Sequence, residues 1–328
     1  MSSNNGILQD KPANRREVFH GFLELIRLPN LLTVPGDILA GFTLAGVSPG
    51  NLPCIVPVLL ISLFLYTCGL ILNDYVDRET DRAERPGRPI PSGRVQPGTA
   101  LTIALVLLVL AIFLSLITGR ENVPLIGCAA SSFHPGFSLI GITGGLAALI
   151  LLYNCCVRTI PLAGFGVMGL CRGANLLLGA SIGARPFTAA VFIGAGLEAS
   201  YIAAVSAIAH QETRGGTVHG ARRFLPLAPV IALASLGMFS RFSFLKMGVI
   251  LFTAGWTWHT LWFGSWNGRS IPTKVGQLIR NIILIQSGLL VLTMDRSPEQ
   301  SHFILIALPF LMLFFIFSLW AGQRFYGS

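Results

Sequence analysis

Four oxygen-bearing side chains follow one apolar stretch of the chain at a regular spacing. Asn73, Asp77 and Asp81 lie four residues apart, and Asp74 lies three residues before Asp77. If the helix that begins in the apolar stretch continues through them, they share one edge of it. Such groups would repel each other without a cation, and magnesium typically joins a few carboxylates to substrate phosphates. The spacing therefore predicts that Asn73, Asp74, Asp77 and Asp81 hold magnesium.

Arginines fill the segment that comes directly after these acids. Arg85, Arg88 and Arg94 stand among prolines and glycines, which favour a shaped loop over a helix. Guanidinium groups match phosphate oxygens in bidentate geometry. Acids for magnesium beside arginines for phosphate predict a diphosphate site. Two simpler interpretations stay open: the acids balance the arginines at a hydrated helix end, or the arginines face anionic lipid.

The composition places these residues at the edge of a membrane. Of the 328 residues, 53% are hydrophobic and 11% are charged, whereas soluble domains carry about a quarter charged residues. The net charge of +9 is explained by membrane loops and anionic phosphate groups, so we expect no nucleic-acid partner. We expect an integral, multi-pass membrane protein in contact with lipid.

Apolar runs predict about ten transmembrane helices, with nine as the alternative. A membrane-spanning helix needs about twenty apolar residues, and we expect a polar tail over residues 1–18 and a single transmembrane domain over residues 19–324. The predicted spans are 19–47, 52–75, 97–118, 137–156, 160–182, 186–209, 224–240, 243–265, 272–294 and 300–322. Residues 121–136 are a candidate for a short re-entrant piece. Loops after the even-numbered spans are the richer in arginine, which predicts that they face the cytosol.

The acids and the arginine loop resemble the first aspartate-rich motif of the UbiA family of prenyltransferases. The matching residues are Asn73-Asp74-x-x-Asp77-x-x-x-Asp81 and Arg85-Pro86-x-Arg88-Pro89-Ile90-Pro91-Ser92-Gly93. The resemblance covers roughly residues 20–225 and implies an all-α bundle around a central cavity that opens sideways to lipid. Family members transfer a prenyl group from an allylic prenyl diphosphate to an aromatic or other lipophilic acceptor. On that pattern the acids hold Mg²⁺, and Arg85, Arg88 and Arg94 take the diphosphate.

The same resemblance implies substrate-binding residues in other spans. Arg27-Leu28-Pro29-Asn30 is similar to the family's opening pattern, and Arg172-Gly173-Ala174-Asn175 resembles the polar face of the fifth span. Tyr153 and Arg158 resemble the residues that close the fourth span, although Val157 stands where lysine is usual. The residues implied to bind substrate are Asn30, Tyr153, Arg158, Arg172 and Asn175.

The second aspartate motif of the family, after the sixth span, is changed in this chain. His210 and Arg214 stand where acids are expected, and Glu212 is the remaining acid. A guanidinium cannot ligate magnesium, and histidine is a poor ligand for a hard cation. Three alternatives follow: Arg214 holds diphosphate with one magnesium on the first motif, Glu212 turns inward as a ligand, or transfer is lost.

These observations predict an Mg²⁺-dependent intramembrane prenyltransferase in which Asp74, Asp77 and Asp81 are catalytic. His210, Glu212 and Arg214 are expected to contact substrate. The alternative is a non-catalytic membrane protein that binds or carries a prenylated or hydrophobic precursor. The changed motif resembles that of the divergent UbiA-like proteins of the bacterial ebo gene cluster.

An acid also lies inside the sixth predicted span. Glu198 is flanked by apolar and small residues, and an ionisable group at membrane depth is a functional candidate by default. Glu198 either lines the cavity or pairs with Arg172, and both possibilities stay open.

Overall fold

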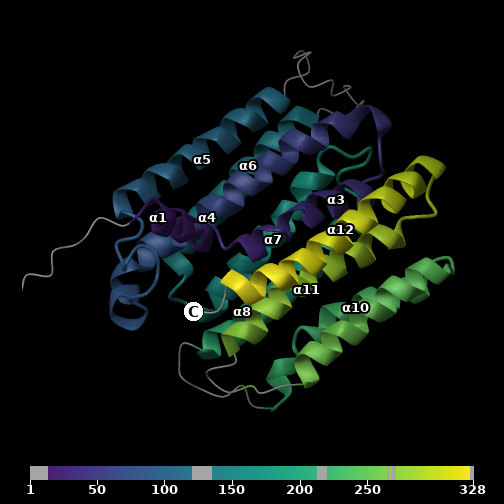
Figure 1. Cartoon of the computed structure of the whole chain (residues 1–328). Helices are drawn as coiled ribbons and strands as arrows, with labels where there is room; N and C mark the ends of the chain where they lie inside the picture. Colours follow the sequence, from purple (N-terminus) through teal and green to yellow (C-terminus); the bar gives the residue numbers. More distant parts are fainter. Residues whose placement is uncertain (1–13, 120–134, 213–219, 264–265, 267–270, 326–328) are drawn as a thin grey trace, which may run out of the picture.

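The long apolar stretches of the chain fold as helices, which satisfy their backbone hydrogen bonds without water. The computed structural model describes residues 14–119, 135–212, 220–263, 266 and 271–325, and every regular element in these ranges is helical. The elements are α1 (Arg15–Leu25), α2 (Leu28–Leu31), α3 (Val34–Leu44), η1 (Pro49–Cys54), α4 (Ile55–Glu84), α5 (Pro97–Thr118), α6 (Pro135–Leu152), η2 (Tyr153–Val157), α7 (Pro161–Ala180), α8 (Ala189–Glu212), η3 (Gly220–Phe224), α9 (Leu227–Met238), α10 (Phe244–Trp262), α11 (Ile271–Leu292) and α12 (Pro298–Phe325). The long helices lie side by side in one bundle, with α5 at one edge and α10 at the opposite edge (Figure 1).

Seven helical segments in the described ranges are long and apolar enough to cross a membrane. They are Pro49–Glu84, Pro97–Thr118, Leu139–Val157, Pro161–Ala180, Ala189–His210, Ile271–Leu292 and Pro298–Arg324. An all-helical, multi-pass fold is therefore confirmed, whereas the predicted count of nine or ten spans is not confirmed by this measure. One reason is α9, whose 12 residues extend over about 18 Å at 1.5 Å per residue. Most of the segment predicted to be re-entrant, 121–136, lies outside the described residues.

Three short helices occupy the first predicted span, 19–47. The break after α1 is at Arg27, whose φ of 46° is in the left-handed region, which a non-glycine residue seldom adopts. Pro29 lies in the first turn of α2, and Pro35 lies in the first turn of α3 after a second break. Hydropathy alone did not reveal these breaks, because the segment is apolar on average even though Arg27, Asn30 and Thr33 are polar. As a result, α1 lies near the end of α4 (Figure 1), and Arg27 can turn into the bundle.

Glycines allow α3 and α7 to approach each other at backbone distance. A Cβ atom added to Gly41 of α3 would overlap the Leu176 carbonyl of α7, and one added to Gly179 of α7 would overlap the Ile38 backbone. Small residues at helix contacts are typical of membrane bundles, where close packing replaces the hydrophobic effect between helices. Because α3 also packs on α4, α8 and α11, this contact fixes the helices that surround the site.

The helix ends opposite the acids form a second, separate polar face. There the Arg296 guanidinium donates to the Leu44 carbonyl at 2.7 Å, and the Gln300 side-chain amide donates to the Thr43 carbonyl at 2.9 Å. The backbone N–H of Arg185 donates to the Ala45 carbonyl at 2.8 Å. The loops after α3, α7 and α11 therefore meet at one end of the bundle, and the acids of α4 lie at the other end.

Candidate functional site

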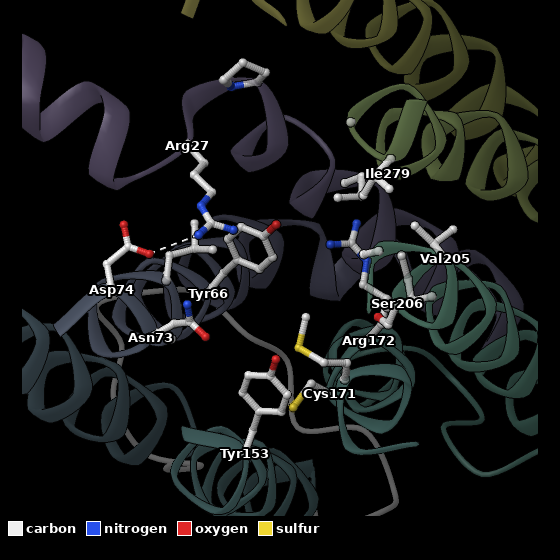
Figure 2. Close-up of a pocket in the computed structure, with 18 of the residues that line it drawn as sticks. Arg27, Tyr66, Asn73, Asp74, Tyr153, Cys171, Arg172, Val205, Ser206 and Ile279 are labelled. Atoms are coloured by element: carbon white, nitrogen blue, oxygen red, sulfur yellow. Dashed lines mark hydrogen bonds and ion pairs between the residues drawn. The ribbon is translucent and has the colours of Figure 1, made fainter. Parts of the chain in front are cut away.

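A cavity of about 840 Å³ lies between α4, α7, α8 and α11, and α1, α2, the loop after α4 and the end of α6 complete its wall. One end is polar and carries Arg27, Asn73, Asp74, Arg85 and Arg88. The rest is largely apolar, with side chains from several helices, among them Leu65, Leu70, Leu146, Ile150, Met168, Ile202, Val205, Val275 and Ile279. Figure 2 shows Arg27 and Asp74 joined across one side of this space, with Tyr66 beside Arg27 and Tyr153 below. The polar end and the apolar body fit a lipid with a charged head.

Helix α4 runs without interruption from Ile55 to Glu84, as the spacing of the acids requires. The Asn73 side-chain amide donates to Asp77 Oδ2 at 3.2 Å, which confirms that these two positions share a face. Asp74 and Asp81 are both buried, with 6% of their surface exposed. The membrane-crossing helix thus carries the whole ladder to the membrane boundary.

Each carboxylate of the ladder faces a guanidinium group. Asp74 Oδ1 lies 3.0 Å from Arg27 Nη2 and 3.6 Å from Arg88 Nη1. Arg88 Nη1 also donates to Asp81 Oδ2 at 2.7 Å, and Arg158 forms an ion pair with Asp77. Arginines therefore balance the acids in this structure, and the same arginines orient the acids.

The ladder fits a single hard cation that a phosphate would help to hold. In the described part of the chain, no three His, Cys, Asp or Glu side chains gather closely enough to hold a metal ion. Asn73 and Asp74 line the cavity and offer oxygen, and magnesium usually takes one or two protein carboxylates together with substrate phosphate and water. Asp77 and Asp81 are not among the residues that line the cavity, and their oxygens pair with Arg158 and Arg88. Asn73 and Asp74 are thus the pair that could hold magnesium.

Two of the three arginines predicted for the diphosphate line the cavity, and the third holds the loop. Arg85 and Arg88 are in the cavity wall. Arg94 forms a two-pronged ion pair with Glu24 of α1, at 2.9 and 2.7 Å, and also donates to the Gly87 carbonyl at 2.6 Å. Arg94 thus holds α1 against the loop. At the polar end of the cavity, Arg27 lines the wall together with Arg85 and Arg88.

The other residues implied by the family pattern divide into two groups. Tyr153, Arg172 and Asn175 line the cavity. Asn30 is buried beside Pro29, which itself lines the cavity, and Arg158 is connected to the ladder by its ion pair with Asp77. Tyr153 begins the π-helical turn η2, a local widening of the helix that often marks functional positions.

The residues of the changed second motif are described only in part. His210 lies near the end of α8, where its ring contacts Phe165 with 5.5 Å between ring centres, and Ala209 is its neighbour in the cavity wall. The side chain of Glu212 and the whole of Arg214 lie outside the described residues. The roles predicted for these two residues stay predictions.

A network of buried polar groups stands behind the cavity wall. Asp37 of α3 has no exposed surface, and its carboxylate lies 2.9 Å from Arg172 Nε and accepts from the Asn175 amide at 2.5 Å. Gln286 of α11 also donates to Asp37. The fully buried Glu198 lies beside Asp37 and Arg172, so it is near Arg172 without lining the cavity.

Several of these residues were not predicted from the sequence to belong to the site. Asp37 and Gln286 each interrupt an apolar run, the signal that singled out Glu198 and that also applied to them. Tyr66 lines the cavity with the Arg172 guanidinium 5.9 Å from its ring centre, but an aromatic residue in a membrane span carries no comparable signal. Arg27 was matched to the family pattern without a role.

The charges around the cavity favour an anionic ligand. Four guanidinium groups line it, those of Arg27, Arg85, Arg88 and Arg172, against the carboxylates of Glu24 and Asp74. Guanidinium groups bind phosphate oxygens with two parallel hydrogen bonds, and a largely apolar wall strengthens such contacts by excluding water. The charge and the apolar wall of the cavity therefore suit an anionic ligand with an apolar body.

Curated relatives of this chain are digeranylgeranylglyceryl phosphate synthases. The relative from Methanospirillum hungatei is 28% identical over 246 residues, which cover 74% of this chain and 80% of that protein. The one from Methanothrix thermoacetophila is 28% identical over 65% of this chain and 74% of its own length. The one from Ignicoccus hospitalis is 37% identical over 40% of this chain and 46% of its own length.

Solved structures are similar over most of the chain. A structure of a digeranylgeranylglyceryl phosphate synthase matches 84% of this chain and 99% of its own, with a TM-score of 0.55 and 20% sequence identity, and shows the same fold. A UbiA homologue from Archaeoglobus fulgidus, solved with DMAPP and Mg²⁺, covers 91% of this chain and 97% of its own, with a TM-score of 0.49 and 17% identity. No protein-family model matches the sequence.

Proposed function

This chain belongs to the UbiA family of intramembrane prenyltransferases, and we propose that its cavity transfers a prenyl group from an allylic diphosphate to a lipophilic acceptor. One observation carries the proposal: Arg27, Asp74, Arg85 and Arg88 gather at one end of a cavity whose remaining wall is mainly apolar. The polar end suits the diphosphate and the apolar body suits the prenyl chain. The acceptor then enters the same space.

The proposed chemistry places each group where charge develops. When the carbon–oxygen bond of the donor breaks, its electron pair stays on the diphosphate, and Arg27, Arg85 and Arg88 stabilise that negative charge. Asn73 and Asp74 would hold Mg²⁺, which when bound neutralises diphosphate oxygens as a Lewis acid. The acceptor forms the new bond to the allylic carbon and loses a proton, while the apolar wall keeps water from that carbon.

Asp77 and Asp81 act through their arginine partners in this proposal. Asp81 accepts a hydrogen bond from Arg88 at 2.7 Å. Asp77 forms an ion pair with Arg158, the residue directly after the turn η2 that begins at Tyr153. An ion pair of this kind fixes a guanidinium in one geometry, which lowers the cost of ordering it around a phosphate. The four members of the ladder therefore divide into Asn73 and Asp74 for the cation and Asp77 and Asp81 for orientation.

A lipid alcohol is the acceptor class that we propose to test first. The relatives are named for digeranylgeranylglyceryl phosphate, a product with prenyl chains on a glyceryl phosphate. Aromatic acceptors are the second class, because the same cavity end would serve any nucleophile that reaches the allylic carbon.

We also propose that the chain crosses the membrane ten times, with nine as the alternative. The three further crossings are the broken segment α1–α3, the short α9 and α10. With ten crossings, an even number of crossings separates the start of α1 from the C-terminal ends of α4, α6, α8 and α12. These ends therefore lie on the same face of the membrane as the start of α1. The short helices would require local thinning of the bilayer or cover by their neighbours, which costs little per ångström.

The test is product formation by the purified protein in lipid nanodiscs. Labelled geranyl, farnesyl and geranylgeranyl diphosphates are each supplied with Mg²⁺ and a panel of glyceryl phosphate lipids and phenolic acceptors, and extracts are examined by mass spectrometry. A prenylated acceptor that requires Mg²⁺ supports the proposal. Tight donor binding without product from any acceptor, including a total membrane lipid extract, would favour the carrier alternative.

A further inference from the structure

One oxygen of Asp74 serves two guanidinium groups that come from different parts of the chain. Asp74 Oδ1 lies 3.0 Å from Arg27 Nη2 and 3.6 Å from Arg88 Nη1. The Asp74 side chain is 8% exposed, and those of Arg27 and Arg88 are 28% and 25% exposed. A carboxylate between two guanidiniums in a cavity wall occupies the place that a phosphate oxygen would take, since both anions present the same acceptor geometry to arginine.

The two arginines are held in position by features other than Asp74. Arg27 stands at the break between α1 and α2 with a left-handed backbone, φ 46°, a conformation that surrounding structure must enforce and that gathers at functional sites. Arg88 is held by Asp81 at 2.7 Å, and its backbone N–H donates to the Arg85 carbonyl at 3.0 Å. Asp81 would therefore keep the Arg88 guanidinium near the cavity without Asp74, and the backbone of Arg27 would keep that residue in the cavity wall.

We propose that Asp74 is an internal counter-ion that competes with the donor's diphosphate for Arg27 and Arg88, and that one divalent cation relieves this competition by taking up the Asp74 carboxylate. The inference rests on the proposed function, because it presupposes that the cavity receives a prenyl diphosphate. Without the cation, Asp74 weakens donor binding by occupying the two arginines. With the cation, Asp74 strengthens donor binding by holding the ion.

The opposite wall of the cavity supports a single cation. The side chains that α8 and α11 contribute there are apolar or hydroxyl-bearing in the described residues, among them Ile202, Val205, Ser206, Ala209 and Thr273. The sequence of 213–219 contains no acid, so Glu212 is the one acid that directly follows this wall. The groups that line the cavity and could balance the remaining charge of a diphosphate are the guanidiniums of Arg27, Arg85, Arg88 and Arg172, on other elements.

The proposal makes cation binding and donor binding interdependent. Because the cation frees the two arginines, the donor binds more tightly in its presence, and linkage requires the donor to raise the affinity for the cation by the same factor. If Asp74 were only a metal ligand, the cation and the donor would still raise each other's affinity. In the presence of a chelator, however, replacing Asp74 would not raise the affinity for the donor.

The test measures donor binding without any metal. Geranyl thiolodiphosphate, an analogue that resists ionisation, is titrated by calorimetry into the protein in nanodiscs with excess EDTA. We expect Asp74→Asn to bind the analogue about tenfold more tightly than wild type, since one competing charge-assisted contact is removed. The matched control is Glu79→Gln, which removes the same charge from the same helix but at an exposed residue paired with Arg82 at 2.9 Å. We expect a change below about twofold there.

A second variant separates release of arginine from simple loss of repulsion. If Asp74→Asn acts by freeing Arg27 and Arg88, its gain should be smaller when Arg27→Gln is already present, because only Arg88 is then left to be freed; this is the non-additivity of a double-mutant cycle. Unchanged or weaker binding in Asp74→Asn would overturn the proposal. So would an equal gain in the Arg27→Gln background.

Wild-type protein gives an independent check if Asp74→Asn does not fold. Mn²⁺ counted by electron paramagnetic resonance with saturating analogue should number one per chain, and Mn²⁺ should tighten analogue binding at least about tenfold by the linkage above. Two ions per chain, or no mutual effect, would contradict the inference. These readouts need no turnover, so a protein that meets them but forms no prenylated product leaves this inference standing and removes the proposed transfer.

Discussion

Arg88 is the residue at which the acidic ladder and the arginine loop meet. Its guanidinium lies 2.7 Å from Asp81 and 3.6 Å from Asp74, and it lines the cavity. Because the loop from Arg85 to Ser92 is closed by backbone hydrogen bonds at Arg88, the side chain is presented from a fixed backbone. Arg88 is therefore the arginine whose loss should affect the charge on the departing diphosphate most directly.

Replacing Arg88 with glutamine should lower kcat/KM for prenyl transfer by about 10²- to 10³-fold, the usual effect of removing one group that stabilises developing charge. Arg88→Lys should recover part of the loss, because lysine keeps the charge but not the two-pronged geometry. The control is Arg82→Gln, since Arg82 is exposed and pairs with the equally exposed Glu79 of the same helix at 2.9 Å. Equal losses in Arg88→Gln and Arg82→Gln would show that net charge alone matters.

At the residue scale, the sequence predicted side chains that follow a periodic pattern and missed those that depend on a backbone break. The spacing of Asn73 and Asp77 needed only the continuation of one helix, and the structure confirms their contact. Arg27 reaches the site because φ at that residue is positive, and although Pro29 marks a helix break nearby, no residue type indicates a left-handed turn at Arg27. The partner of Arg94 was equally hidden, because Glu24 lies 70 positions away in the sequence.

At the scale of the helices, a buried charge network joins the elements that form the cavity wall. Asp37 of α3 contacts Arg172 and Asn175 of α7 and Gln286 of α11. Ser62 of α4 donates to Asn175 at 2.6 Å. Since Arg172, Asn175 and Ser62 also line the cavity, the network that holds four helices together also shapes the wall that faces the substrate.

Breaking this network from one side should cost more than removing both partners. Arg172→Gln should lower the free energy of unfolding by about 3–5 kcal/mol, because the buried Asp37 loses its counter-ion. Adding Asp37→Asn should restore part of that loss, and the coupling is measured by reversible unfolding in mixed micelles. The exposed pair Glu79 and Arg82 is the control, with an expected coupling below about 1 kcal/mol. Additive losses at Asp37 and Arg172 would mean that the two groups do not interact.

The helices themselves were predicted well where hydropathy decides them and poorly where local backbone decides them. The predicted span 97–118 coincides with α5, whereas the predicted span 19–47 became three short helices. Proline at the start of α2 and of α3 marks both breaks. Contacts such as that of Gly179 with Ile38 depend on which faces meet, and one sequence does not specify that.

At the scale of the whole molecule, the two ends of the bundle differ in charge and in role. The end with the cavity's polar groups carries the arginines of the loop after α4, such as Arg88, which pairs with the ladder. Arg158 and Arg223 lie at the same end. Among the described residues the opposite end carries fewer cations, and two of them are Lys246, paired with Asp295, and Arg296. Basic residues favour the cytosolic side, so the diphosphate would enter from the cytosol.

This orientation predicts which engineered cysteines an impermeant maleimide can reach. Ser92→Cys, in the exposed part of the loop after α4, should be labelled only after cells are opened. Glu299→Cys, exposed at the start of α12 on the opposite face, should be labelled in intact cells. Both are made after the exposed Cys155 and Cys156 have been replaced by serine. The reverse pattern would place the site on the outer face.

In the proposed mechanism, the polar groups at the end of α4 promote ionisation of an allylic diphosphate inside the membrane. The most direct measurement is Mg²⁺-dependent release of diphosphate from geranylgeranyl diphosphate by the protein in nanodiscs, supplied with a total lipid extract as the source of acceptors. We predict release by wild type that falls at least about 10²-fold in Asp74→Ala, since its cation ligand is lost, while Glu79→Ala retains wild-type release. Release that is equal in wild type and Asp74→Ala, or no release from wild type, would contradict the account.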